Sequence, residues 1–291
     1  MALLSLVLTL KPLQTAATPT LPPAWWGRAA HALLLHTVRE VDENLAAELH
    51  TPPGEVEEHA SASSNQVRPF TASTLMGRFN KGTPEPQSTY TLRLTAFRDD
   101  LAAILEQSSQ SGTLSPGRTI GLDYLPFEIM PNPTLAPIAN SISAIQKSSY
   151  QDISSPYLLA KQPAPRRLTL QFTSPTTFKS AGKHLPIPLP ALVFGSLLER
   201  WNAYSPISFP VEVRRYAEEC LAISQFALET RPVPQKNRGL RVGAVGRISY
   251  TALNYDRYWM SVLAVLAEFS LFCGVGVGTS QGLGQARRIE D

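Results

Sequence analysis

The end of the chain joins a long apolar segment, residues 258–273, directly to a glycine-rich stretch. Two Gly-x-Gly units, at residues 274–276 and 282–284, are separated by five residues. Glycine lacks a Cβ and tolerates positive φ, so this spacing favours a loop whose backbone comes close to a bulky neighbour. The amides of such a loop can face an anion, and Arg287 and Arg288 add fork-shaped donors for phosphate. The alternative is a glycine-rich turn between a helix and a final edge strand.

The expected elements follow the same order in both halves of the chain. In the first half, periodicity predicts strands at 1–10, 68–71, 88–97 and 118–129, and helices from residue 24, at 42–49 and at 101–107. In the second half it predicts strands at 167–172 and within 238–250, and helices at 190–201, 211–228 and 256–272. The order β-α-β-β-α-β is that of the ferredoxin-like fold.

We therefore expect an α+β protein of two tandem ferredoxin-like (RRM-like) domains with antiparallel sheets. The first domain spans residues 1–150 and the second 151–291, with the boundary in a Pro/Ser-rich stretch at 131–165. Hydrophobic residues make up 43% of the chain and charged residues 17%, which is enough apolar surface for a core. The net charge of +3 permits a polyanionic partner without requiring one.

The cysteines and the N-terminus indicate the compartment. Cys220 and Cys273 lie in helix-like apolar stretches, which favours buried free thiols over a disulfide and a cytoplasmic, reducing environment. Residues 1–10 alternate in polarity and lack a basic n-region, so they predict a buried first strand rather than a signal peptide. The apolar run before the glycine-rich stretch is short and contains Glu268, so no membrane span is expected.

Several motifs resemble the CRISPR-associated endoribonucleases that process repeat RNA, in the repeat-associated mysterious protein superfamily. Residues 274–284 resemble their C-terminal glycine-rich loop, and 42–50 resemble a segment that ends in Leu-His. Arg-Pro-Phe-Thr at 68–71 resembles a basic-x-Phe-Thr stretch, and 168–179 resemble a strand leading into Ser-Pro-Thr. The segment 197–202 also fits, so the resemblance spans most of the chain. In that family the five-residue spacer usually carries Lys or Arg, whereas residues 277–281 carry neither.

The resemblance implies metal-independent cleavage of CRISPR repeat RNA (pre-crRNA) by the ribose 2′-hydroxyl, leaving a cyclic phosphate and a 5′-hydroxyl. This reaction needs a base, an acid and a cation for the crowded phosphate. His50 occupies the family's Leu-His position and is the expected proton carrier, and Arg68 is the expected cation. His31 or His36 is the candidate second proton carrier, and His36 is nearer to the position where some relatives have tyrosine.

The resemblance also implies the partners. Repeat RNA (crRNA) is the expected ligand, and a place in a CRISPR effector complex and a homodimer remain open. No cofactor or metal is expected, because no Asp, Glu and His cluster has metal-ligand spacing. The residues expected to contact RNA are Gly274, Gly276, Gly282, Gly284, Arg287, Arg288, Lys179 and Lys183.

Each of these readings has an alternative. His50 can be a polar helix end that complements the helix dipole, and a packed or surface role is the more common one for His31 and His36. The basic residues can be solvated charges. The whole chain can be an RNA-binding subunit that holds the 3′ hairpin of the guide without cutting it. A dinucleotide fingerprint is excluded at 274–276, because a helix precedes it where a strand is needed.

Overall fold

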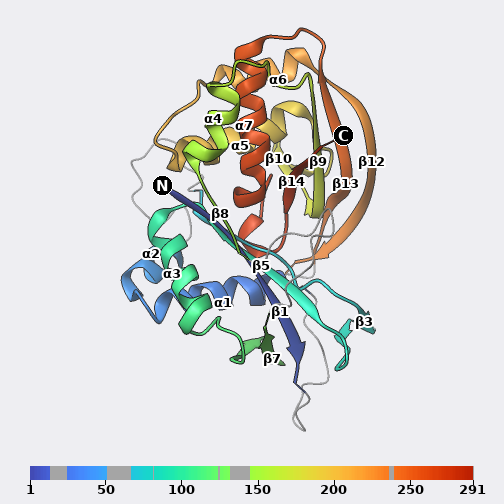
Figure 1. Cartoon of the computed structure of the whole chain (residues 1–291). Coiled ribbons are helices and arrows are strands. Elements are labelled where there is room, and N and C mark those ends of the chain that lie inside the picture. Colours follow the sequence, from blue (N-terminus) through green and yellow to red (C-terminus); the bar gives the residue numbers. More distant parts are fainter. Residues whose placement is uncertain are drawn as a thin grey trace, which may run out of the picture.

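The computed structural model describes residues 1–13, 25–50, 67–80, 82–123, 125–131, 145–235 and 239–290. Helices and antiparallel sheets form two α+β units, the first in the lower half of Figure 1 and the second in the upper half. Both units have ferredoxin-like topology, as the sequence predicts.

The first unit is built around its first strand, β1 (Ala2–Pro12), which lies in the sheet order β2-β5-β1-β7-β6. The fourth-strand position of the fold is shared: β7 pairs with residues 9–12 of β1, and β8 pairs with residues 2–6. The other elements are α1 (Gly27–Arg39), α2 (Glu43–His50), β2 (Phe70–Ala72), β3 (Phe79–Asn80), β4 (Thr83–Pro84), β5 (Tyr90–Ala96), α3 (Asp99–Ser111), β6 (Thr119–Leu122), β7 (Leu125–Met130) and β8 (Ile145–Ser149).

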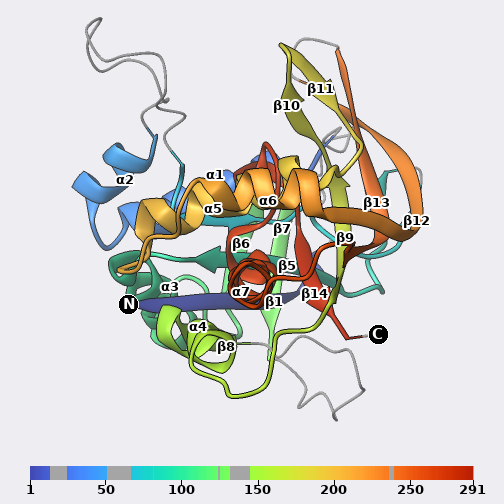
Figure 2. The ribbon, with the colours of Figure 1, turned by 90° about the horizontal axis from the view of Figure 1, so that it is seen from above.

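The second unit has the sheet order β12-β13-β9-β14, and a hairpin of β10 and β11 projects from it (Figure 2). The insertions of this unit are that hairpin and α6. Its elements are α4 (Tyr150–Leu158), β9 (Arg167–Thr176), β10 (Phe178–Ser180), β11 (Lys183–Leu185), α5 (Pro190–Tyr204), α6 (Glu212–Cys220), β12 (Leu221–Pro234), β13 (Leu240–Ala252), α7 (Arg257–Cys273), the short 3-10 helix η1 (Thr279–Gln281) and β14 (Ala286–Ile289).

Helix α7 joins the two units. It lies at the centre of the molecule, seen end-on in Figure 2, and nearly every side chain along it is buried. Leu3 and Phe97 of the first unit belong to the same core cluster as α7. At its C-terminal end, Thr95 Oγ1 donates a hydrogen bond to the carbonyl of Phe272 at 2.5 Å. The glycine-rich loop that follows α7 therefore begins at the contact between the units.

Several local predictions are confirmed. Asp42 caps α2, because its Oδ1 accepts a hydrogen bond from the Leu45 amide at 2.9 Å. Residues 2–12 form the expected buried strand, and Cys220 and Cys273 are free thiols, of which Cys273 is fully buried. Within the described ranges, no helix is both long and apolar enough to cross a membrane.

One local prediction is wrong. The helix expected at 211–228 ends at Cys220, and Leu221 begins the long edge strand β12, which pairs with β13 over most of its length. Short apolar runs do not distinguish helix from strand by periodicity, and pairing with β13 decides this one. The Pro/Ser-rich stretch at 131–165 contains the strand β8 and also the helix α4, which the sequence did not predict. Residues 132–144 of it lie outside the described part of the chain.

Candidate active site

The glycine-rich loop after α7 is shaped by the chain's own backbone. Gly274, Gly276, Gly282 and Gly284 all have positive φ, between 65° and 93°. A Cβ on Gly276 would lie 2.3 Å from the carbonyl oxygen of Thr177, and one on Gly284 would lie 2.1 Å from that of Val275. The bulky neighbour that these glycines approach is thus internal, and glycine is required there whether or not RNA binds.

The loop is fixed by both units. On the side of the second unit, the Gly276 amide donates to Ser196 Oγ at 2.8 Å, and Arg200 Nη2 donates to the Gly276 carbonyl at 2.5 Å. On the side of the first unit, the Gly282 amide donates to the carbonyl of Ala72 at 2.8 Å. Trp25 Nε1 donates to the carbonyl of Gln281 at 2.7 Å. The uncharged spacer, residues 277–281, therefore takes part in the hydrogen bonds that hold the two units together.

His31, on α1, connects Arg68 to this loop. Its Nδ1 lies 3.0 Å from the carbonyl oxygen of Ser280, so Nδ1 carries the proton and donates it to that oxygen. The other ring nitrogen, Nε2, then accepts a hydrogen bond from Arg68 Nη1 at 3.3 Å. Arg68 Nη1 also reaches Ser280 Oγ at 3.5 Å. Residues far apart in the sequence thus meet in one constellation, which we call the His31–Arg68–Ser280 cluster.

The charge of this cluster resides on Arg68. Burial and the adjacent Arg68 charge lower the pKa of His31 to about 4, so the ring is neutral near pH 7. Burial lowers the pKa of Arg68 as well, although guanidinium keeps its proton in water at any ordinary pH. The Nε and Nη2 of Arg68 make no hydrogen bond to any described residue, so they can serve a ligand.

The structure separates the remaining histidines. His50 is exposed at the end of α2, and its charge contributes to lowering the pKa of His31, which places it near the cluster. His36 lies on another face of α1, with Nε2 3.5 Å from Glu40 Oε1 and Nδ1 3.4 Å from Arg39 Nη2. His36 is therefore not part of the cluster. The sequence favoured His36 over His31, whereas the packing of α1 on the loop brings His31, and not His36, to Arg68 and Ser280.

A cleft of about 580 Å³ opens beside the cluster. Its walls come from Arg68, from α5, from the loop residues 276–281 and from the β10–β11 hairpin. Glu199 is the acidic residue among those that line it. The basic side chains and the histidine that line it are Arg68, Lys179, His184, Arg200, Arg214 and Arg241. This excess of positive charge in a concave surface suits a polyanion.

Most of these cations were not singled out in the sequence. Lys179 was expected to contact RNA and lines the cleft, and Lys183 lies at the tip of the same hairpin, paired with Ser180. Burial, together with the nearby Arg241 and Lys179 charges, lowers the pKa of His184. Arg241 comes from β13, and no motif marks it as a ligand. Among the described residues, no group of three or more His, Cys, Asp or Glu could hold a metal ion.

Comparison with known proteins agrees with this geometry. The family model described as "CRISPR-associated endoribonuclease Cas6" matches residues 170–286. A Cas6 structure described as a product complex is 25% identical, covers 100% of both chains and has a TM-score of 0.70. The chain is therefore similar to Cas6 proteins over residues 170–286 in sequence and over its whole length in fold. Thermus thermophilus Cas6, at 23% identity, has the same fold over 99% of this chain and 98% of that one, with a TM-score of 0.64.

Curated relatives match this chain over a shorter length than the solved structures do. The CRISPR-associated endoribonuclease Cas6 of Mycobacterium tuberculosis is 30% identical over 127 residues, which are 43% of this chain and 40% of that protein. The chain thus aligns with less than half of the length of that Cas6.

The two arginines after the loop have partners within the protein. Arg287 donates from Nε and Nη2 to Gln171 Oε1, at 3.0 and 2.8 Å. Arg288 forms an ion pair with Glu268, 2.6 Å from Nη1 to Oε1, and its guanidinium lies over the ring of Tyr157. Both arginines lie on β14 and do not line the cleft. The structure therefore does not bring Arg287 and Arg288, which the sequence predicts to contact RNA, together with Arg68 and the lysines of the β10–β11 hairpin.

Proposed function

We propose that this chain is a Cas6-type, metal-independent endoribonuclease that cuts CRISPR repeat RNA into guide units. The observation that carries the proposal is the His31–Arg68–Ser280 cluster at the edge of a basic cleft, with His50 nearby. Two similar Cas6 structures are described as a product complex and a substrate mimic complex, and a third as a histidine-to-alanine mutant. These descriptions support an RNA ligand and a role for histidine in this chain.

In the proposed reaction, the 2′-hydroxyl next to the scissile phosphate loses its proton and attacks phosphorus in line. The P–O5′ bond breaks, and the 5′-oxygen takes up a proton as it leaves. The products are a 2′,3′-cyclic phosphate and a 5′-hydroxyl. His50 is exposed at the end of α2 and exchanges these protons with the RNA, because imidazole titrates near neutral pH.

Arg68 stabilises the phosphate as its negative charge becomes crowded. Its Nε and Nη2 offer two donors in one plane, which matches two phosphate oxygens. Neutral His31 accepts from Nη1 and so fixes the direction of this fork, while Ser280 O fixes His31. We assign His31 as a positioning residue for Arg68. His36 remains the weaker candidate for proton transfer, because its neighbours are Glu40 and Arg39.

The RNA hairpin is proposed to lie in the cleft, against Lys179, Lys183 and Arg241. RNA helices are recognised by shape, phosphates and 2′-hydroxyls, and a scattered set of cations suits this. The uncharged spacer is compatible with such binding, because its carbonyls are used to hold Trp25 and His31. The loop then shapes the cleft wall rather than neutralising phosphate by itself.

The direct test is cleavage of the cognate repeat RNA in excess EDTA. A cyclic-phosphate product is expected, and a 2′-deoxy substitution at the scissile nucleotide should abolish it. His50→Ala should reduce the cleavage rate about 10²- to 10⁴-fold, the usual contribution of general acid–base catalysis, without changing RNA affinity. Activity that requires a metal, or normal cleavage by His50→Ala, would refute the mechanism.

Matched variants separate the roles in the cluster. His36→Ala tests the weaker candidate: a loss of cleavage rate as large as that of His50→Ala would assign the second proton transfer to His36. Arg68→Lys keeps the charge but loses the planar fork, so we expect a slower cleavage step with RNA affinity changed far less. If wild-type protein binds repeat RNA tightly yet leaves it intact, the chain is instead an RNA-holding subunit of an effector complex.

A further inference from the structure

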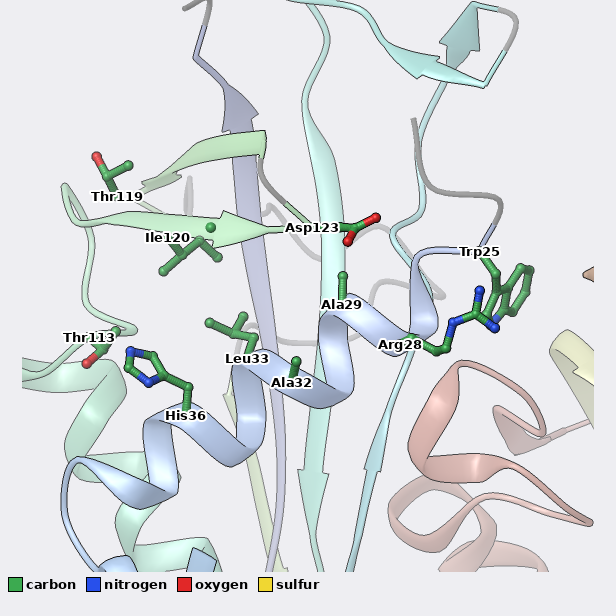
Figure 3. A pocket seen from close by; sticks show the side chains of 11 residues that line it. Trp25, Arg28, Ala29, Ala32, Leu33, His36, Thr113, Thr119, Ile120 and Asp123 are labelled. Carbon is green, nitrogen blue, oxygen red and sulfur yellow. The ribbon is translucent and has the colours of Figure 1, made fainter. Parts of the chain in front are cut away.

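A second groove lies on the outer face of α1. It has a volume of about 540 Å³, and Figure 3 shows the side chains that line it. One wall is a stripe along α1, and the other comes from the end of α3 and from β6 with the turn after it. The α1 stripe consists of Trp25, Arg28, Ala29, Ala32, Leu33 and His36. Positions 28, 32 and 36 are four residues apart, so they share one helix face.

The groove adjoins the cleft where one hydrogen bond joins their lining residues. Trp25 lines the groove, and its Nε1 donates to the carbonyl of Gln281 at 2.7 Å. Gln281 in turn lines the cleft. In Figure 3 the pale red C-terminal segment runs beside Trp25 and Arg28. A chain that leaves the cleft over the glycine-rich loop therefore arrives at the Trp25 end of the groove.

The lining suits an unpaired nucleotide. Leu33 and Ile120 give an apolar floor, and both are buried. Around this floor lie hydroxyl, imidazole, carboxylate and guanidinium groups, from Thr119, His36, Asp123 and Arg28. The charge of Arg28 is offset by that of Asp123, so the groove has little net charge. It therefore favours a base and sugar, with a single phosphate near Arg28. Single-strand sites combine such apolar or aromatic platforms with a cation for the backbone.

From these observations we infer that the groove binds single-stranded RNA adjoining the hairpin that occupies the cleft. The inference rests on the proposed function, because it takes the repeat RNA as the ligand and adds a second contact region to it. Bases would stack against the Trp25 and Leu33 side of α1, and Arg28 would hold a phosphate between the groove and the cleft. His36, which lies outside the His31–Arg68–Ser280 cluster, then contacts RNA rather than the reacting atoms.

The exposed face of α1 offers a way to fill the groove. Ala32 lines the groove and is exposed in the middle of the helix, so a larger side chain there enters the groove and leaves the core intact. Ala32→Trp and Ala32→Phe fill it with two different rings, which guards against an effect of one particular side chain. Ala103→Phe is the matched control, because Ala103 is exposed on α3 and does not line the groove.

The experiment compares three RNAs bound to the full chain carrying His50→Ala. One is the repeat hairpin alone, and the other two carry an unpaired arm of about 8 nucleotides on the 5′ side or on the 3′ side, within the size range of single-strand sites. We expect the arm on one side to raise affinity roughly 10-fold, the value of about one stacked base. Ala32→Trp and Ala32→Phe should remove this gain and leave hairpin binding unchanged, while Ala103→Phe should keep it.

Crosslinking tests RNA binding in the groove without relying on the proposed cleavage activity. An arm that carries 4-thiouridine should crosslink to the peptide 25–39 in wild-type protein and not in Ala32→Trp. This outcome would support the groove even if no RNA is cut. If neither arm raises affinity, or if both filled variants bind the extended RNA as wild type does, the inference is wrong. The groove would then belong to a protein partner.

Discussion

The two ferredoxin-like units have the same order of strands and helices, but they bury their second helix differently. In the first unit, α3 buries one face, with Leu101 and Leu105, and exposes Asp99 and Asp100. In the second, α7 is covered on nearly all sides, including an unbroken buried run at 260–267. The first unit also divides its fourth strand between β7 and β8, whereas the second completes the sheet with β14 alone.

This difference separates the part of the site that fixes its shape, which we call the frame and which consists of α7 and the glycine-rich loop, from the side chains that would act on a ligand. The second unit contributes the packed helix and the glycine-rich loop, whose conformation is fixed by backbone contacts. The first unit contributes His31, His50 and Arg68, which lie at its surface facing that loop. We therefore expect substitutions in the loop to act mainly on stability, and substitutions of the first unit's site residues to act mainly on function.

The largest expected effect tests the frame. Gly276→Ala places a Cβ 2.3 Å from a backbone carbonyl at φ 77°, so both strain and overpacking oppose folding. Summing these two terms gives a loss of roughly 3 kcal/mol or more in the free energy of unfolding. Chemical denaturation of the purified variant measures it. Gly239→Ala is the matched control, because its Cβ meets nothing, and it should change stability by less than about 0.5 kcal/mol.

A loss of stability in Gly276→Ala no larger than in the control would break the comparison. It would mean that the loop rearranges easily, and its glycines would then serve ligand binding rather than internal contacts.

A smaller effect tests whether the first unit's cluster is coupled to the frame. The pKa of His31 is lowered from 6.5 to about 4 in the native protein, so as the pH falls the unfolded chain protonates its imidazole before the native protein does. The free energy of unfolding is therefore unaffected by this group above about pH 6.5. It decreases as the pH falls to about 4, by on the order of 3 kcal/mol. Denaturation of wild type and His31→Asn across this range measures the difference.

His31→Asn is chosen because its amide can still donate near Ser280 O while the acceptor for Arg68 is lost. We expect its stability to fall less steeply than that of wild type between these pH values. Parallel curves would show that His31 does not titrate in contact with Arg68, and the assigned positioning role would then be withdrawn.

The smallest effect distinguishes the cations of the hairpin from those of β14. Lys179→Ala should lower RNA affinity and reduce the slope of log K against log salt by about 1, the value of one phosphate contact. Arg288→Ala should leave that slope unchanged and instead cost about 2 kcal/mol of stability, because Glu268 and Tyr157 lose a charged donor. Binding titrations at several salt concentrations, with denaturation of both variants, check this contrast.

Arg288→Ala is the more decisive of the two variants, because the sequence predicts that Arg288 contacts RNA whereas the structure pairs it with Glu268. A reduced salt slope for Arg288→Ala would restore that assignment and would mean that its ion pair with Glu268 opens when RNA binds.

Much of the fold could be predicted because it depends on local pattern. The alternation of residues 1–10 and the apolar run of 258–273 specify a strand and a helix in any context. Residues 221–228 could not be assigned in the same way, because a short apolar run fits either type until β13 pairs with it. Likewise, α4 lies in a stretch with Pro156 inside it, and it forms because Tyr150 and Ile153 pack into the core around α7.

The candidate site divides along the same line. The spacing of the glycines in 274–284 and the Arg-Pro-Phe-Thr motif at 68–71 were visible in the sequence, and the structure brings these two segments together. The sequence favoured His36 over His31, because it could not show which face of their common helix packs against the loop. Nor could it show that Arg287 and Arg288 bond to Gln171 and Glu268, or that Arg241 lines the cleft.

The sequence by itself determined which segments form strands and helices, where glycine is unavoidable, and which families the motifs resemble. Local propensity and hydrophobic periodicity act between residues close in the chain, so they can be read directly. The tertiary structure alone decided that His31 meets Arg68 and Ser280, since these residues are separated by 37 and 249 positions. Contacts over such distances depend on how α7 and its loop dock the two units, and no local pattern encodes that docking.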